Sequence, residues 1–181
     1  MKIDEKLLED CIRCKRLAQN QLYKEVFSYL MNICIRYKND YNTAGASLNA
    51  IFLKILTNLN QFNKKDSFVP WMKRIAVNHL IDEYRKEKRE KEKIRFEDSL
   101  VSSNSSTHHE MEAEMDSEYL VKMIQQLPQT TAQVFNLYAI DGFKHREIAE
   151  MLAMSENTSK WHVSDARKKL QCMLSTYNET V

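Results

Sequence analysis

The chain has 181 residues, a formal net charge of +2, and only two glycines and two prolines. Tight turns between strands need glycine at positive φ, so this composition argues against a strand-rich protein and predicts an all-α fold. Apolar runs are too short to span a membrane and the first ten residues are rich in charge, so we expect no signal peptide and a cytoplasmic protein with reduced cysteines.

The charged residues are segregated along the chain. Residues 64–95 hold eleven Lys or Arg against six Asp or Glu, whereas residues 96–118 hold seven acidic residues and no Lys or Arg. A local basic block of this kind is typical of proteins that bind nucleic acid.

Apolar residues recur every three or four positions in the N-terminal third, which predicts two amphipathic helices separated by a polar turn at residues 38–45. The two apolar faces consist of Leu22, Val26, Leu30, Ile33 and Tyr37, and of Leu48, Ile51, Phe52, Ile55, Leu56 and Leu59. Cys11 and Cys14 are spaced like half of a zinc site, but no second pair follows them. We therefore interpret them as two apolar positions on a helix and predict neither metal nor cofactor.

A third helix is predicted from about Phe68 to about Lys93, with Asp66 or Ser67 as its N-cap and Pro70 in its first turn. Its expected inward face consists of Phe68, Met72, Ile75, Leu80 and Tyr84, with Trp71 beside it.

The other side of this helix carries a polar stripe whose members are spaced four, four, three and four residues apart: Arg74, Asn78, Asp82, Arg85 and Arg89. Such spacing places all five on one side of a helix. A polar loop precedes the helix and contains Lys64, Lys65, Asp66 and Ser67. Beside aromatic residues, this loop is suited to hold an extruded base of single-stranded DNA. The alternative is a solvated helix face.

Residues 93–116 carry no apolar stripe, and we interpret them as a flexible acidic linker. Four short helices are predicted after it. The first covers about 117–126 and ends at Pro128, and the second starts at residue 130 or 131. Gly142 closes the second helix through a positive φ.

The last two predicted helices form a helix-turn-helix, with the first over residues 144–152 and the second from a Ser155 cap to about Tyr177. In this motif the second helix enters the major groove of duplex DNA, where amide and lysine groups suit base edges and flanking cations suit phosphates. The outward residues are Asn157, Thr158, Lys160, Trp161, Ser164, Arg167 and Lys168. Trp161 either faces outward or packs on the first helix. The alternative to DNA binding is a helix pair with solvated charges.

The two basic elements, in this order, resemble the extracytoplasmic-function (ECF) sigma factors of bacterial RNA polymerase. Their region 2.3–2.4 is similar to Phe68-x-x-Trp71-Met-x-Arg74-Ile-Ala-x-Asn78-x-x-Ile81-Asp82-x-x-Arg85-Lys86. Their region 4 is similar to three stretches: Leu127-Pro128-x-x-x-x-x-Val134-Phe135-x-Leu137, Gly142-Phe143-x-x-x-Glu147-Ile148-Ala149 and Ala166-Arg167-Lys168-Lys169-Leu170.

The resemblance implies two small helical domains, region 2 at residues 1–92 and region 4 at residues 117–181, joined by the linker at 93–116. Region 2 is implied to bind the β′ clamp helices and to melt the −10 element through the polar stripe, Trp71 and the loop at 64–67. Region 4 is implied to bind the β flap and to read the −35 element through the outward residues of the last helix. An anti-sigma factor is a further implied partner.

The stretch aligned with the family's polymerase-docking helix departs from the family pattern. The family has Asp-x-x-Gln-Glu-x-Phe, whereas this chain has Ala46-Ser47-Leu48-Asn49-Ala50-Ile51-Phe52. The implied docking residues are Asn49, Phe52, Leu53 and Lys54. Because both acidic positions are alanine, we expect core binding that is weaker or differently distributed, or an accessory factor that recruits the protein.

Two other function classes stay open. One is a helix-turn-helix transcriptional regulator that binds duplex DNA without acting as a polymerase subunit. The other is a protein-interaction module whose basic stripe is solvated. Neither a Gly-rich phosphate loop nor a nucleophile at motif spacing occurs in the sequence, so we predict no enzymatic activity.

Overall fold

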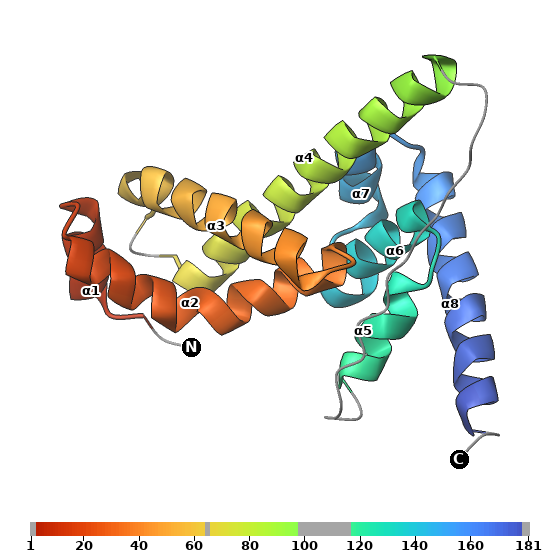
Figure 1. The fold of residues 1–181 in the computed structure, drawn as a ribbon, viewed down its shortest axis with the longest axis horizontal. Helices are drawn as coiled ribbons and strands as arrows, with labels where there is room; N and C mark the ends of the chain where they lie inside the picture. The colour runs from red at the N-terminus through yellow and green to blue at the C-terminus, as the bar shows by residue number, and fades with distance from the viewer. Residues whose placement is uncertain (1–2, 64–65, 98–116, 179–181) are drawn as a thin grey trace. The chain divides into compact units, whose positions relative to one another are not determined.

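The computed structural model describes residues 3–63, 66–97 and 117–178. Every regular element in these ranges is a helix (Figure 1), which confirms the predicted all-α fold. The chain divides into two compact units, Met1–Glu83 and Tyr84–Val181. The expected linker at 93–116 lies mostly outside the described residues.

Unit 1 is built from α1 (Glu5–Ile12), α2 (Arg16–Tyr37), α3 (Tyr41–Asn58), the 3-10 turn η1 (Leu59–Gln61) and the first part of α4 (Phe68–Glu97). The helix α2 packs along α3, and α1 packs on α2. The predicted apolar faces of α2 and α3 are confirmed, since most of their members are buried: Leu22, Val26, Leu30, Ile33, Tyr37, Leu48, Ile51, Ile55 and Leu59.

The connection between α2 and α3 is shorter than predicted. Residues 38–40 alone lie between the helices, so the predicted turn over 38–45 is wrong for its second half. Asp40 caps α3: its carboxylate accepts hydrogen bonds from the backbone N–H of Thr43 at 2.9 Å and from the Thr43 hydroxyl at 2.7 Å. These bonds hold the pKa of Asp40 below its ordinary value. Polar residues are favoured in the first turn of a helix, where they bind free backbone groups. In the sequence, the polar first turn of α3 therefore looks like a loop.

Cys11 lies in α1 and is buried, but Cys14 does not share this helix. It follows α1 with a φ of 57° and is exposed. Its backbone N–H binds the carbonyl of Cys11 at 2.9 Å, and the N–H of Lys15 binds the carbonyl of Asp10 at 3.0 Å. This left-handed residue turns the chain into α2, so the prediction that both cysteines occupy one helix is wrong.

The helix α4 begins at Phe68, as predicted, and extends to Glu97, four residues beyond its predicted end. The backbone carbonyl of Ser67 accepts a 3.4 Å hydrogen bond from the N–H of Trp71. The predicted inward residues are buried except Ile75, which is half-buried. The buried face of α4 is broader than predicted and also contains Ala76, Val77 and Ile81.

In unit 2, the described residues after α4 form α5 (Ser117–Gln125), α6 (Gln129–Phe135), α7 (His145–Leu152) and α8 (Glu156–Asn178). Helix α6 starts at Gln129, whereas the sequence predicts a start at Thr130 or Thr131. The apolar sides of α5, α6 and α8 meet in one core, which contains Ile124, Leu127, Ala132 and Ala166, with Phe135, Leu170 and Met173 packed against it.

Helix α6 continues directly into a π-helical segment, η2 (Asn136–Ile140), which the sequence does not predict. Gly142 follows with a φ of +82°, as predicted, and leads the chain toward α7. Ala153 then closes α7 with a φ of 51°. The two residues with a left-handed backbone, Gly142 and Ala153, therefore lie on either side of α7, the first helix of the helix-turn-helix.

Candidate nucleic-acid interface

The polar stripe of α4 is open to solvent. All five members are exposed: Arg74, Asn78, Asp82, Arg85 and Arg89. At 3.6 residues per turn they lie within an arc of roughly 80°, along roughly 22 Å of the helix. The Nε of Arg89 donates a 3.2 Å hydrogen bond to the carbonyl of Arg85 in the same helix. The stripe thus presents guanidinium, amide and carboxylate groups on the side of α4 that faces away from the core.

An aromatic cluster lies at the start of this stripe. The ring of Phe62 is 5.5 Å from the ring of Phe68 and 5.1 Å from that of Trp71, and the last two are 5.6 Å apart. Phe68 is buried, whereas Phe62 and Trp71 are half-buried. The partly open rings offer a surface on which an unpaired base can stack.

The loop before α4 is described in part. Asp66 and Ser67 are exposed, and the backbone N–H of Asp66 binds the carbonyl of Asn63 at 2.9 Å. Lys64 and Lys65 lie outside the described residues.

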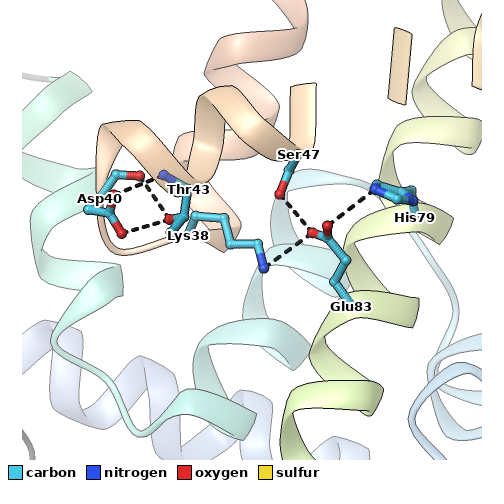
Figure 2. A network of polar contacts seen from close by, with 6 residues as sticks. All are labelled: Lys38, Asp40, Thr43, Ser47, His79 and Glu83. Atoms are coloured by element: carbon cyan, nitrogen blue, oxygen red, sulfur yellow. Dashed lines mark hydrogen bonds and ion pairs between the residues drawn. The ribbon is translucent and has the colours of Figure 1, made fainter. Parts of the chain in front are cut away.

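A second set of polar residues of α4 faces α3 and the α2–α3 connection rather than solvent (Figure 2). The Oε2 atom of Glu83 accepts a 2.7 Å hydrogen bond from the Ser47 hydroxyl and lies 3.2 Å from Nζ of Lys38. Its Oε1 atom lies 3.3 Å from Nε2 of His79, although the two are not aligned as a hydrogen bond. We call these four residues the Glu83 network. The sequence analysis missed it, because the contacts of Ser47 and Lys38 with Glu83 join residues that are 36 and 45 positions apart.

Charge is unevenly distributed in the Glu83 network. Burial opposes the ionised form of Glu83, but the hydrogen bond from Ser47 and the charge of Lys38 outweigh burial and hold the pKa of Glu83 below its ordinary value. Burial also lowers the pKa of His79, even though Glu83 and Asp82 act to raise it. At neutral pH the network therefore contains an ionised Glu83 beside a charged Lys38 and a neutral His79.

In unit 2, the second helix of the helix-turn-helix begins as predicted. The Ser155 hydroxyl accepts a 3.0 Å hydrogen bond from the backbone N–H of Thr158, which satisfies a free donor at the start of α8. The side chain of Glu147 does the same for the backbone N–H of Lys144 before α7, at 2.8 Å. The outward residues of α8 are all exposed: Asn157, Thr158, Lys160, Trp161, Ser164, Arg167 and Lys168.

Two histidines hold the inner side of α8. Nδ1 of His145 lies 3.0 Å from the hydroxyl of the fully buried Ser159, and Nδ1 of His162 lies 3.0 Å from the hydroxyl of Thr131. Burial lowers the pKa of His162. The ring of Tyr138 stacks on His145 at 4.4 Å. The two histidine contacts join α8 to α7 and to α6, and the sequence analysis did not identify them.

The exposed side of α8 includes two large side chains. Trp161 is 60 % exposed, and its nearest ring contact is its neighbour His162 at 4.9 Å. Of the two predicted alternatives, Trp161 therefore adopts the outward one. The guanidinium of Arg167 lies 5.9 Å from the centre of the Tyr138 ring, close enough for a cation–π contact that orients it.

A shallow groove of about 600 Å³ lies between α2 and α3 in unit 1, lined by Leu17, Tyr23, Phe52 and Leu56 together with the polar Arg16, Gln19 and Asn20. The hydroxyl of Tyr23 donates a 3.0 Å hydrogen bond to Oδ1 of Asn49, and its ring meets that of Phe52 edge-on at 4.9 Å. Leu17 and Leu53 are 85 % and 62 % exposed.

The exposed side of α3 mixes apolar and neutral polar residues with one lysine. Ala46, Leu53 and Lys54 are exposed, and Ala50 is half-buried. Helix α3 contains no Asp or Glu between Tyr41 and Asn58. The acidic pattern expected at a polymerase-docking helix is therefore missing from the whole element.

The cysteines are free thiols. Burial raises the pKa of Cys11 to about 11 and that of Cys34 to about 12, so both are protonated at neutral pH. Among the described residues, no three His, Cys, Asp or Glu side chains are placed to hold a metal ion. Within the same ranges, no helix has the length and apolarity needed to cross a membrane.

Two parts of the chain match two regions of one protein family. Residues 22–90 match the family described as Sigma-70 region 2, and residues 117–170 match Sigma-70, region 4. The first match begins within α2 and contains α3 and the polar stripe, and the second contains α7 and the first part of α8. A regulator with the helix-turn-helix alone does not account for the first match.

Curated relatives span both regions. The chain is 25 % identical over 139 residues to the RNA polymerase sigma factor SigZ of Bacillus subtilis, a match that covers 75 % of each protein. It is 24 % identical over 166 residues to the ECF RNA polymerase sigma factor SigM of the same organism, covering 87 % of this chain and 96 % of SigM. It is 27 % identical over 124 residues to the ECF RNA polymerase sigma factor EcfG of Rhodopseudomonas palustris, covering 67 % of this chain and 66 % of EcfG.

Two solved structures share the fold. The sigma factor RpoE of Bartonella quintana, crystallised with the anti-sigma factor NepR, superposes with a TM-score of 0.56 at 20 % identity, covering 86 % of this chain and 96 % of that chain. CnrH, in complex with the cytosolic domain of CnrY, superposes with a TM-score of 0.51 at 18 % identity, covering 96 % of this chain and 97 % of CnrH.

The family matches occur in the order that the two basic elements predict, and together they contain both exposed polar surfaces. The resemblance drawn from those elements is thereby confirmed. The chain belongs to the ECF group of the sigma-70 family, whose members are non-catalytic subunits that direct RNA polymerase to promoters.

Proposed function

We propose that this chain recognises its promoters by holding two forms of DNA on two separate surfaces. The stripe of α4 takes the unpaired strand of the −10 element, and the outward side of α8 takes the −35 duplex. One observation carries the proposal: the five stripe residues of α4 and the seven outward residues of α8 are all exposed, and the two sets lie on different helices.

The chemistry of the α4 surface suits unpaired DNA. Bases freed from the duplex expose their pairing edges, which Asn78 and Asp82 are able to hydrogen-bond. Arg74, Arg85 and Arg89 supply positive charge for the backbone, and Trp71 supplies a stacking surface. The loop residues Lys64, Lys65, Asp66 and Ser67 complete this surface in the proposal and receive the extruded base.

The α8 surface suits an intact duplex. Its first two turns present Asn157, Thr158, Lys160 and Trp161, which is where a recognition helix meets base edges. Ser164, Arg167 and Lys168 follow farther along the helix and suit phosphate oxygens. Region 2 and region 4 thus divide the work, with boundaries that we place at residues 1–92 and 117–181.

We place the polymerase-docking surface of region 2 on α3, at Asn49, Phe52, Leu53 and Lys54, with the β′ clamp helices as its partner. Support comes from the exposed Leu53 and from the partly apolar groove beside Phe52. Without carboxylates on α3, docking depends on apolar burial rather than on ion pairs. The β flap is the proposed partner of region 4.

The protein acts in the cytoplasm in this proposal, where RNA polymerase and promoter DNA are found. An anti-sigma factor or an accessory recruiting factor is a further proposed partner. The structural relatives RpoE and CnrH were each solved with a second protein, NepR or CnrY, and NepR is an anti-sigma factor.

The proposal is tested by separating promoter opening from duplex binding. Asn78→Ala should reduce permanganate reactivity of the −10 bubble about tenfold while the −35 duplex still shifts in a gel, because the lost amide contacts only unpaired bases. Lys160→Ala should instead weaken duplex binding by about 1–3 kcal/mol.

Matched controls are Asn32→Ala and Lys122→Ala, which remove the same side chains from exposed positions on α2 and α5. Both should behave like the wild type. Equal losses in both assays for Asn78→Ala and Lys160→Ala would reject the division of work, and failure of the wild type to bind core polymerase would reject the whole proposal.

A further inference from the structure

Glu83 connects three separate segments of unit 1 through one carboxylate. Lys38 comes from the α2–α3 connection, Ser47 from α3, and Glu83 itself from α4 (Figure 2). Ser47 is 3 % exposed, and the side chains of Lys38 and His79 are 13 % and 12 % exposed. The carboxylate is therefore held by groups that have little freedom to move.

The position of Glu83 on α4 relates it to the polar stripe. Glu83 directly follows Asp82, and at 100° per residue it lies roughly 140° around the helix from the middle of the stripe. The core side of α4 is apolar, and apolar packing is not directional. Hydrogen bonds and ion pairs with fixed partners are directional, so they select one rotation of a helix among several that bury similar apolar area.

A small rotation of α4 has a large effect at the stripe. Side-chain ends lie about 6 Å from a helix axis, so a 20° rotation moves them by roughly 2 Å. This displacement exceeds the tolerance of a hydrogen bond.

We propose that Glu83 is a positioning residue for promoter opening. Held by Lys38 and Ser47, it fixes the rotation of α4 so that Asn78 and Asp82 meet the unpaired strand. This inference rests on the proposed function of the stripe and adds the residues that aim it. In this proposal Glu83 does not touch DNA and acts through Asn78 and Asp82.

The role differs from simple stabilisation. A partly buried ion pair contributes little net stability compared with an apolar group of the same size, since desolvation offsets its attraction. We therefore expect the Glu83 network to have a small effect on folding and a large one on the geometry of the stripe.

The first test replaces Glu83 and the two residues that hold it by apolar groups in the full-length chain, with Lys38→Met, Ser47→Ala and Glu83→Leu combined. We expect a melting temperature equal to or above that of the wild type, unchanged core binding, and about tenfold less permanganate reactivity. The probe is a duplex selected with the wild-type holoenzyme from a randomised promoter library.

The second test uses Glu83→Gln, which keeps an acceptor for Ser47 and removes the charge facing Lys38. Combined with Asn78→Ala in a double-mutant cycle, its opening defect should add only in part to that of Asn78→Ala, because both changes remove the Asn78 contact. Glu90→Gln is the control, since Glu90 forms an exposed ion pair with Lys86 at 4.0 Å on the same helix. It should open promoters like the wild type.

The outcomes are distinguishable from failure of the proposed function. If Asn78→Ala opens promoters normally, the stripe itself is misassigned. If Asn78→Ala is defective but the apolar triple variant and Glu83→Gln both open promoters normally, the inference about Glu83 is wrong. Fully additive defects in the cycle would likewise overturn it.

Discussion

His79 and Glu83 are one helical turn apart on α4, and the fold shifts the pKa of each in the same direction. Burial keeps the His79 ring neutral, although Glu83 and Asp82 pull its pKa upward while Lys54 and Lys38 push it down. Ser47 and Lys38 keep Glu83 ionised. At the scale of single residues, unit 1 therefore favours the deprotonated form of both groups.

We expect the stability of the chain to fall as the pH is lowered. His79 titrates at a lower pH in the folded than in the unfolded chain, so its contribution is complete above about pH 6.5 and decreases below that value. The contribution of Glu83 is present above 4.5, its ordinary pKa, and is lost as the pH falls through its lower folded value.

Thermal unfolding between pH 7.5 and 5.5 measures the first effect. His79→Gln should flatten the pH dependence in this range but not abolish it, because burial also lowers the pKa of His162. An identical pH dependence in His79→Gln and the wild type would contradict the assignment.

The chain's two glycines have opposite roles at the scale of elements. Gly45 lies inside α3, and Gly142 has a φ of +82° before α7. A Cβ added at either position meets no atom within 4 Å. The backbone alone therefore decides the effect of a substitution.

Gly45→Ala should stabilise the chain by about 0.5–1 kcal/mol, because alanine favours helix. Gly142→Ala should destabilise it by about 1–2 kcal/mol, because a side chain strains the left-handed backbone. Urea unfolding of the two variants beside the wild type measures both values, and each serves as the control for the other. A stabilising Gly142→Ala would contradict the turn geometry.

Helix positions were predictable where one side of a helix is buried. The apolar periods of α2 and α3 and the Ser155 cap are local signals. The first turn of α3 was missed because its polar residues bind their own backbone, as Asp40 and Thr43 do. The η2 segment was missed because a π-helix has no residue pattern of its own.

The candidate site was predictable to the same extent. The spacing of the α4 stripe and of the outward residues of α8 follows from helix periodicity, and all the described members are exposed as expected. The contacts that orient these helices were not predictable. Ser47 and Glu83, or Thr131 and His162, are brought together by tertiary packing across 36 and 31 residues.

At the scale of the whole molecule, charge is nearly balanced. A net charge of +2 attracts DNA weakly, so affinity has to come from local basic groups. On α8 these groups include the exposed Lys160, Arg167 and Lys168.

Salt titration of −35 duplex binding tests whether these basic groups of α8 contact the DNA phosphates. Each phosphate contact contributes about −0.9 to the slope of log K against log salt concentration. Lys168→Ala should make the slope shallower by about 0.9, whereas Lys122→Ala on α5 should leave it unchanged. A wild-type slope in Lys168→Ala would place that lysine away from the phosphates.

The two tryptophans have a practical consequence. Trp71 belongs to the half-open aromatic cluster at the stripe, and Trp161 is exposed on α8. The chain has no other tryptophan. Intrinsic fluorescence therefore carries one natural probe for each DNA-binding surface. In the full-length protein, Trp161→Phe would leave an emission signal that reports strand separation, and Trp71→Phe would leave one that reports duplex engagement, with no dye attached.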